Sequence, residues 1–113
     1  MSRRRVVVTG MGIVAPVGIG IDAAWADILA GKSGITAITR FDASTFPSRI
    51  AGEVKNFDVS KWLSAKEARR YDTFIHYGLV ASMEAIRDAR LDDYTGDKER
   101  AGVCIGSGIG ACR

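Results

Sequence analysis

The sequence predicts an α/β fold built around a single βαβ-type unit. Two short apolar runs, Val6–Val8 and Val103–Ile105, each lead into a glycine-rich segment, which is typical of strands buried on both faces of a parallel sheet. A long stretch with helical spacing of apolar residues precedes the second run. Because crossovers between parallel strands are right-handed in nearly all proteins, we expect two parallel, neighbouring strands joined by a right-handed connection.

The composition is that of one globular unit. The chain has 113 residues, of which 47% are hydrophobic and 26% charged, so it is not a disordered polypeptide. Its net charge is +3, whereas a nucleic-acid binder usually carries a larger and more concentrated excess. No apolar run approaches the roughly 18 to 20 residues that span a bilayer, and no secretory signal is evident. We therefore expect a cytoplasmic protein with neither a nucleic-acid nor a membrane partner.

The small number of cysteine and histidine residues limits the catalytic and metal-binding chemistry that the chain can provide. Cys104 and Cys112 are too few for a disulfide framework and have neither a CxxC nor a metal-ligand spacing. His76 is the single histidine, so a nucleophile–base–orienter triad or a zinc site would have to form without a second one. We expect no metal site, no cofactor and a reducing compartment.

The residues after the first strand are predicted to contain one short helix. Residues 11–20 hold three glycines and a proline, which favours a loop. Residues 21–30 carry apolar side chains at helical spacing, and Gly31 follows as the expected C-terminal glycine. The pattern weakens over residues 32–63, which we interpret as a surface excursion with a small hairpin near the alternating residues 50–54.

A second helical region is predicted to begin at a capping box. Ser64 and Glu67 have the spacing at which a serine and a glutamate satisfy each other's free backbone donors. The helical pattern extends to about Ala89, and from Asp72 onward it is apolar around most of its circumference. The clear polar stripe consists of Glu84, Arg87 and Asp88. We therefore expect a long buried helix with neighbours on more than one face.

Both glycine-rich segments match the pattern G-x-G-x-x-A of dinucleotide-binding loops. In residues 10–15 the match follows a predicted strand, where glycines let a pyrophosphate approach a helix N-terminus. Pro16 opposes this interpretation, because its ring would clash within the first turns of such a helix. The second match, residues 106–111, lies at the end of the chain. We favour tight strand-to-loop turns and keep a nucleotide-binding fragment as an alternative.

The net charge of the chain is concentrated in residues 61–70. This segment holds Lys61, Lys66, Arg69 and Arg70 against Glu67 alone, a local excess equal to the whole net charge of +3. One interpretation is an ordinary solvated helix face. The other is a docking patch for an acidic partner, which would act mainly on the rate and orientation of association.

Four segments, taken in order, closely resemble one known family. They are residues 6–18 (VVVTGMGIVAPVG), Trp25 with residues 29–35 (LAGKSGI), residues 66–72 (KEARRYD) and residues 105–110 (IGSGIG). Together they resemble the opening of the type II β-ketoacyl-acyl-carrier-protein synthases, which are thiolase-like condensing enzymes. The resemblance covers nearly all of the chain but only the N-terminal portion of the family's members.

The resemblance implies a thiolase-like fold of which residues 1–113 form a partial N-terminal domain, with no complete second domain. The family's members are homodimers in which a cysteine takes an acyl chain from acyl carrier protein and condenses it with malonyl-carrier protein, with loss of carbon dioxide. That cysteine and two supporting histidines belong to later motifs, so His76 and Cys104 are interpreted as packing residues. We expect a truncated synthase that is inactive by itself and whose parent elongates acyl chains in fatty-acid biosynthesis.

Two sets of site residues follow from the resemblance. Lys66, Arg69 and Arg70 match basic positions that meet the acidic carrier protein. Ile109 matches the isoleucine that lines the acyl pocket near the dimer interface. A non-catalytic module that binds acyl carrier protein remains an alternative function.

The last three residues depart from the family. Where its members continue with a second glycine and an apolar residue, this chain ends in Ala111, Cys112 and Arg113. A one-base deletion in a GC-rich stretch that encodes Gly-Gly-Leu-Pro would produce this ending. We hypothesise a frameshift or a truncated reading frame, which resequencing of the source DNA would test.

Overall fold

The structure is a computed structural model, and it describes residues 3–110 of the chain. Most of its regular elements are short, and the longest is a helix of 16 residues. In chain order the helices and strands are β1 (Val14–Ala15), β2 (Gly18–Ile19), α1 (Ile21–Leu29), β3 (Ile35–Ala37), β4 (Ile50–Gly52), α2 (Ala65–Arg70) and α3 (Thr73–Asp88). The 3₁₀ turns are η1 (Val59–Lys61), η2 (Leu91–Asp93) and η3 (Lys98–Arg100).

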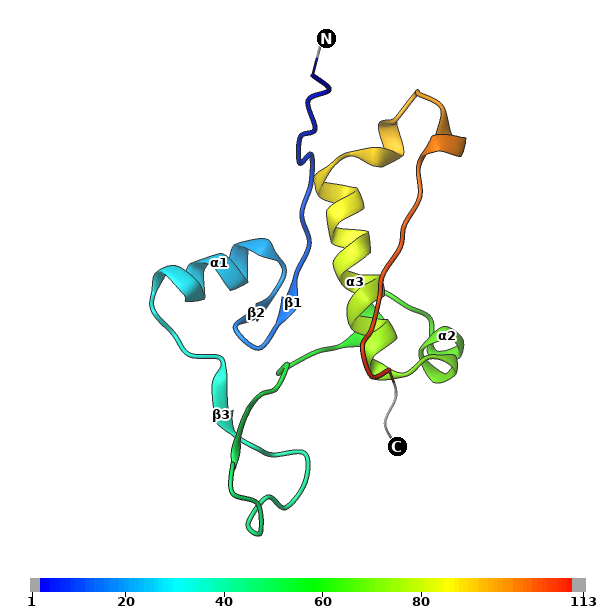
Figure 1. Cartoon of the computed structure of the whole chain (residues 1–113). Helices are drawn as coiled ribbons and strands as arrows, with labels where there is room; N and C mark the ends of the chain where they lie inside the picture. Colours follow the sequence, from blue (N-terminus) through cyan, green and yellow to red (C-terminus); the bar gives the residue numbers. More distant parts are fainter. Residues whose placement is uncertain (1–2, 111–113) are drawn as a thin grey trace.

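Helix α3 is the element against which both extended ends of the chain lie. Figure 1 shows the segment before β1 and the segment after η3 as extended ribbons beside this helix. Gly12 approaches the α3 backbone at Ala81, and Ile105 lies near Gly78 on the same helix. The helix therefore joins segments from opposite ends of the sequence.

The two predicted parallel strands are not formed in residues 3–110. Val6–Val8 and Val103–Ile105 have no strand partner there, and the exposed fractions of Val6 and Val103 are 93% and 70%. A β-strand requires hydrogen bonds to a neighbouring strand, and neither segment has such a neighbour within residues 3–110. The predicted pair of strands and its right-handed crossover are therefore corrected, although the segments have the extended course that a strand needs.

The glycine-rich residues 11–20, predicted to be a loop, contain a tight antiparallel hairpin. Val14 pairs with Ile19 and Ala15 pairs with Gly18, so Pro16 and the following valine form a two-residue connection. Pro16 donates no backbone hydrogen bond, which suits a turn position outside the ladder. The sequence pattern did not predict this hairpin, because each strand has only two residues and is too short to show an alternation.

Helix α1 confirms the helix predicted between positions 21 and 30. Gly31 follows the helix with a φ angle of 66°, the left-handed conformation that glycine adopts at helix C-termini. Ala24, on the inner face of the helix, is buried. The outer face is open to solvent, since Trp25 and Leu29 are 58% and 70% exposed.

The excursion between α1 and α2 contains the predicted hairpin. Strands β3 and β4 pair antiparallel with Ile35 opposite Gly52 and Ala37 opposite Ile50. The alternating residues near position 50 were the sequence signal for one strand, and its partner β3 had no separate signal. The two strands form a sheet of their own.

Glu53, directly after β4, joins the two sides of this excursion, and Arg40 links the excursion to α3. Its carboxylate accepts hydrogen bonds from the Thr39 hydroxyl at 2.7 Å and from the backbone N–H of Arg40 at 3.3 Å. Glu53 is buried, and the hydrogen bond from the Thr39 hydroxyl is the main cause that lowers the pKa of its carboxyl group. The Arg40 guanidinium in turn donates to the hydroxyl of Tyr77 on α3 at 2.9 Å.

The predicted helical region from Ser64 to about Ala89 consists of two helices. α2 ends at Arg70, Tyr71 is extended, and the Asp72 side chain accepts from the Thr73 N–H to begin α3. An aspartate at this position offers an N-cap to a new helix, which is why the region divides there. The capping box at the start of α2 is confirmed.

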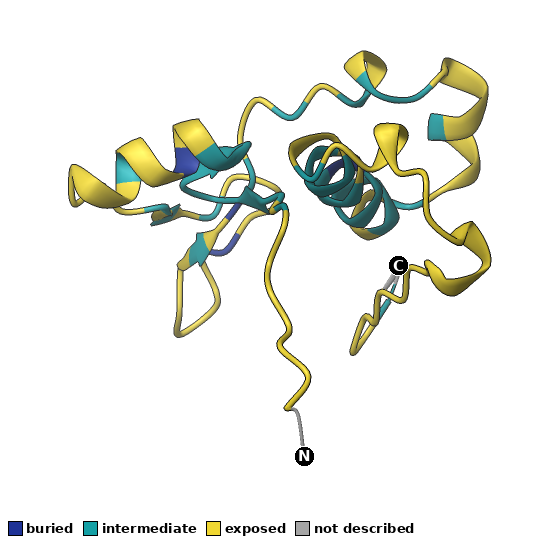
Figure 2. Ribbon diagram, turned by 90° about the horizontal axis from the view of Figure 1, so that it is seen from above, coloured by how far each residue is buried: buried dark blue, intermediate teal, exposed yellow. Residues whose placement is uncertain are grey.

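The expected long buried helix is only partly covered. Val80 is the one fully buried side chain of α3, whereas Phe74 and Met83 are 37% and 39% exposed. In Figure 2, which looks from above, most of α3 has intermediate burial, and the extended segments beside it are exposed. The apolar circumference of α3 thus has more surface than residues 3–110 cover.

The molecule as a whole is open. Its accessible surface is 9532 Å², whereas a folded monomeric protein of this mass exposes about 6,000 Å². Its radius of gyration is 17.4 Å, against about 13 Å for a compact domain of this length. The buried apolar side chains of residues 3–110 are Ala24, Ala43 and Val80, which is a small core for a chain of this length.

Candidate functional site

The cationic side chains of α2 form an exposed face. Lys66, Arg69 and Arg70 are all exposed, and their spacing of three and four residues gathers them on one side of the helix. The one ion pair within residues 3–110 joins Lys32 to Asp27, so these three cations are not neutralised by an ion pair within the described chain. We call Lys66, Arg69 and Arg70 the cationic face.

Glu67, the acidic residue that lies between the cations of α2, caps the N-terminus of the same helix. The Glu67 carboxylate accepts hydrogen bonds from the Ser64 hydroxyl at 2.6 Å and from the Ser64 N–H at 2.9 Å. The hydrogen bond from the Ser64 hydroxyl is the largest cause that lowers the pKa of Glu67. The carboxylate is thus held ionised at the N-terminus of α2, where it also complements the helix dipole.

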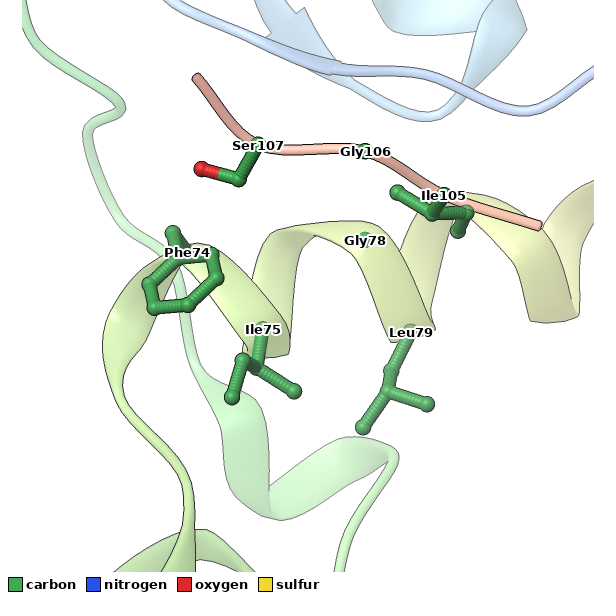
Figure 3. Close-up of a pocket in the computed structure, with 7 residues that line it drawn as sticks. All are labelled: Phe74, Ile75, Gly78, Leu79, Ile105, Gly106 and Ser107. Carbon is green, nitrogen blue, oxygen red and sulfur yellow. The ribbon is translucent and has the colours of Figure 1, made fainter. Parts of the chain in front are cut away.

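A groove of about 320 Å³ lies between α3 and the extended C-terminal segment (Figure 3). Segment 105–107 crosses α3 near Gly78, where a larger side chain would meet Ile105. The groove is lined by Phe74, Ile75, Gly78, Leu79, Ile105, Gly106 and Ser107. None of them titrates near neutral pH, so the groove suits an apolar group rather than acid–base chemistry.

Ile109 lies beyond the groove in a turn at the end of the described chain. Its side chain is 82% exposed, and it is not among the residues that line the groove. The turn is held by the Gly110 N–H, which donates to the Ser107 hydroxyl oxygen at 3.1 Å. The role of Ile109 in an acyl pocket therefore stays a prediction.

The first glycine motif is used for packing rather than for a phosphate. A Cβ atom at Gly10 or Gly12 would overlap the carbonyl oxygen of Ala85 or Ala81 on α3, so glycine is needed for close approach to the helix. The residues after Gly12 form β1 rather than the start of a helix. This part of the chain therefore lacks the helix N-terminus that a dinucleotide-binding loop presents, and the tight-turn interpretation is refined to a helix contact.

The polar stripe of α3 holds the N-terminal segment in place, a role that the sequence reasoning missed. The Asp88 carboxylate accepts from the Met11 N–H at 2.9 Å, and the Glu84 carboxylate accepts from the Ile13 N–H at 3.4 Å. Two acids four residues apart on an apolar helix were the available signal. Their partners are backbone N–H groups, which the sequence does not distinguish from one another.

His76 and Cys104 do not form a catalytic pair. His76 is half-buried, and its Nε2 atom lies 3.1 Å from the carbonyl oxygen of Ala68 on α2, which agrees with a packing role. Cys104 is exposed, so its predicted packing role is corrected: within residues 3–110 no strand covers the segment that carries it. Cys112, Ala111 and Arg113, with the frameshift hypothesis, lie outside the described residues.

No group of three or more histidine, cysteine, aspartate or glutamate side chains that could hold a metal ion occurs in residues 3–110. Over the same span, no helix is both long enough and apolar enough to cross a bilayer.

Comparison with known proteins identifies the class to which this arrangement belongs. The family model described as "Beta-ketoacyl synthase, N-terminal domain" matches residues 3–112. The chain belongs to the β-ketoacyl synthase family. A solved structure, "The ishigamide ketosynthase/chain length factor", superposes on this chain with a TM-score of 0.71 at 32% identity. The superposition covers 89% of this chain and 24% of that one.

Particular relatives are closer in sequence. The chain is 49% identical over 110 residues to "3-oxoacyl-[acyl-carrier-protein] synthase 2" of Vibrio cholerae, which covers 97% of this chain and 27% of that protein. The proteins of the same name from Coxiella burnetii and Staphylococcus aureus are both 46% identical, over 97% and 96% of this chain. The chain thus spans about a quarter of the length of these curated relatives.

Proposed function

We propose that these residues work as the N-terminal portion of a 3-oxoacyl-[acyl-carrier-protein] synthase that elongates acyl chains in fatty-acid biosynthesis. The support is the family match over residues 3–112 and the 49% identity to a relative of that name. In the proposed reaction, a cysteine thiolate outside this chain accepts the acyl group from its carrier thioester. Loss of carbon dioxide from malonyl-carrier protein then supplies the enolate that attacks the acyl thioester and releases the cysteine.

The part of this function that the chain itself carries is docking of acyl carrier protein. The decisive observation is the cationic face of α2, whose three side chains are exposed while Glu67 is bound to Ser64. A cationic helix face without internal neutralisation attracts an acidic partner and orients its approach. The proposed synthase is a cytoplasmic homodimer, and Ile109 lines its acyl pocket.

The docking proposal is tested by charge reversal in a hybrid synthase. In this hybrid, residues 3–110 of the chain replace the matching residues of the Vibrio cholerae relative. The double variant Lys66→Glu/Arg69→Glu should weaken binding of acyl carrier protein by roughly tenfold at low salt, since each reversal replaces an attraction by a repulsion. Titration calorimetry at about 0.01 M and about 1 M salt should show the loss shrinking as the Debye length falls from about 30 Å to about 3 Å.

A matched control separates docking from a general effect of charge. Lys98→Glu/Arg100→Glu makes the same change in net charge at exposed positions in η3, which Figure 1 shows at the opposite end of α3 from α2. This control should leave the dissociation constant close to that of the unsubstituted hybrid. An equal loss in both double variants, or no loss at low salt in either, would leave the cationic face as an ordinary solvated surface.

A non-catalytic carrier-binding module is the second candidate, and one observation favours it. The groups that hold α2, the Ser64–Glu67 capping box and His76, all lie within this chain. Salt-sensitive binding of acyl carrier protein by the 113-residue chain, without any carbon-chain extension, would support the module. Absence of binding at low salt would exclude it.

A further inference from the structure

The C-terminus of α2 depends on a partner from another helix. α2 has six residues, and helices much shorter than about 12 residues are marginal in water without tertiary contacts. Its first turn is satisfied by the capping box. The carbonyl groups of its last four residues receive no hydrogen bond from a backbone N–H of the helix. Tyr71 follows in an extended conformation rather than as a left-handed cap.

His76 supplies that partner. Its Nε2 atom lies 3.1 Å from the Ala68 carbonyl oxygen, which is one of the four orphan acceptors of α2. A carbonyl oxygen only accepts hydrogen bonds, so Nε2 carries the proton and donates. Within residues 3–110 this is the one side-chain hydrogen bond that joins α2 to α3.

The contact lies on the side of α2 away from its charges. At about 100° per residue, the Ala68 position is roughly 160° around the helix from Lys66 and Arg70 and roughly 100° from Arg69. Ala68 is half-buried, whereas the three cations are exposed. An anchor at Ala68 therefore sets the direction in which the cationic face points without touching the partner that docks on it.

We propose that His76 is a positioning residue for carrier-protein docking, acting through its hydrogen bond to Ala68. This inference rests on the docking function proposed above. Without the bond, α2 keeps its connection to α3 through residues 71 and 72 but loses the restraint on its orientation. The three cations would then sample several directions, and fewer encounters with the carrier protein would be productive.

The test uses the hybrid synthase and two substitutions at one position. His76→Leu substitutes an apolar side chain of similar size and removes the donor, whereas His76→Gln supplies an amide N–H that can reach a carbonyl oxygen. His76→Leu should raise KM for the carrier-bound substrate between about twofold and tenfold with little change in kcat. His76→Gln should restore most of the original KM.

A double-mutant cycle shows whether His76 acts through the cationic face. If it does, His76→Leu should add little to the KM of the Lys66→Glu/Arg69→Glu variant, because coupled residues are not additive. Full additivity, a fall in kcat equal to the rise in KM, or no rescue by glutamine would overturn the positioning role. Absence of any effect from Lys66→Glu/Arg69→Glu alone would instead overturn the proposed docking function.

Discussion

At the scale of single residues, two glycines decide how closely the N-terminal segment can approach α3. Gly10 and Gly12 lie where a Cβ atom would overlap backbone atoms of the helix. The acids Glu84 and Asp88 bind the same segment through its backbone N–H groups. A pattern that resembles a nucleotide fingerprint is thus explained by a helix contact and two hydrogen bonds.

Gly12→Ala is therefore expected to be strongly destabilising. The added methyl group would overlap the Ala81 carbonyl oxygen, and overpacking of this kind typically costs 1 to 3 kcal/mol, roughly, with more when backbone must move. Thermal unfolding of the hybrid synthase should show a lower melting temperature. Gly102→Ala is the matched control, because nothing lies within 4 Å of its added Cβ; equal melting temperatures for the two variants would contradict the packing interpretation.

Ile109 carries the second prediction at this scale. If it lines an acyl pocket in the complete synthase, Ile109→Trp should shorten the longest acyl chain that the hybrid accepts, because the larger side chain fills the pocket. The product distribution measured by mass spectrometry checks this. Lys98→Trp, at an exposed polar position, is the control, and an unchanged distribution in Ile109→Trp would remove Ile109 from the pocket.

At the scale of elements, the β3–β4 hairpin is held by a carboxylate whose protonation can be controlled. Glu53 has a lowered pKa because it accepts hydrogen bonds, first from the Thr39 hydroxyl and then from backbone N–H groups. A carboxyl group with a lower pKa in the folded state stabilises that state once it is ionised. This contribution is fully present above the unfolded pKa, about 4.3 for glutamate, and is lost as the pH falls through the folded pKa.

Glu53→Gln should accordingly lower the melting temperature of the hybrid synthase by a few degrees at pH 7. The difference from the unsubstituted hybrid should shrink below about pH 4, where the original carboxyl group also becomes protonated. Glu99→Gln, at an exposed position in η3, is the control and should have little effect at either pH. A deficit in Glu53→Gln that is constant across this range would show that shape rather than charge matters at this site.

At the scale of the whole molecule, the chain leaves much of its apolar surface exposed. Val6–Val8, segment 103–105 and the outer face of α1 are exposed and apolar. At about 25 cal/mol per Å², each 400 Å² of apolar surface left in water forgoes about 10 kcal/mol, comparable to the stability of a typical domain. Unpaired extended segments also offer edges for association.

We therefore expect the isolated 113-residue chain to be partly unfolded or aggregated and to show no carbon-chain extension. Size-exclusion chromatography with light scattering, followed by an assay with acyl- and malonyl-carrier protein, tests both points. His76 is the single histidine of the chain, and its Nε2 atom lies at the Ala68 carbonyl oxygen, so the two histidines that condensation requires are not both supplied by these residues. A monomer with a sharp, reversible and concentration-independent melt would show a domain in its own right, and product formation by the purified chain would refute its inactivity.

Features that depend on neighbouring residues were predictable from the sequence. The α1 helix with Gly31 at its end, the capping box of Ser64 and Glu67, and the clustering of Lys66, Arg69 and Arg70 all follow from spacings of a few residues. Their geometry is set by backbone angles and side-chain reach within one or two turns, so the amino-acid order alone contains it. The family resemblance over the four quoted segments was confirmed for the same reason, since it depends on residue order.

Only the tertiary structure decided how distant segments use their polar groups and apolar faces. The sequence alone determined that Val6–Val8 and Val103–Ile105 favour an extended course, but strand formation needs a hydrogen-bonding neighbour, and residues 3–110 provide none. Likewise, the bond from His76 to Ala68 and the bonds from Met11 and Ile13 to Asp88 and Glu84 pair a side chain with a backbone group. Nearly every residue has the same backbone N–H and C=O groups, so the sequence does not indicate which of them a side chain will bind. The pairing is decided only when packing on α3 brings the two groups within hydrogen-bond distance.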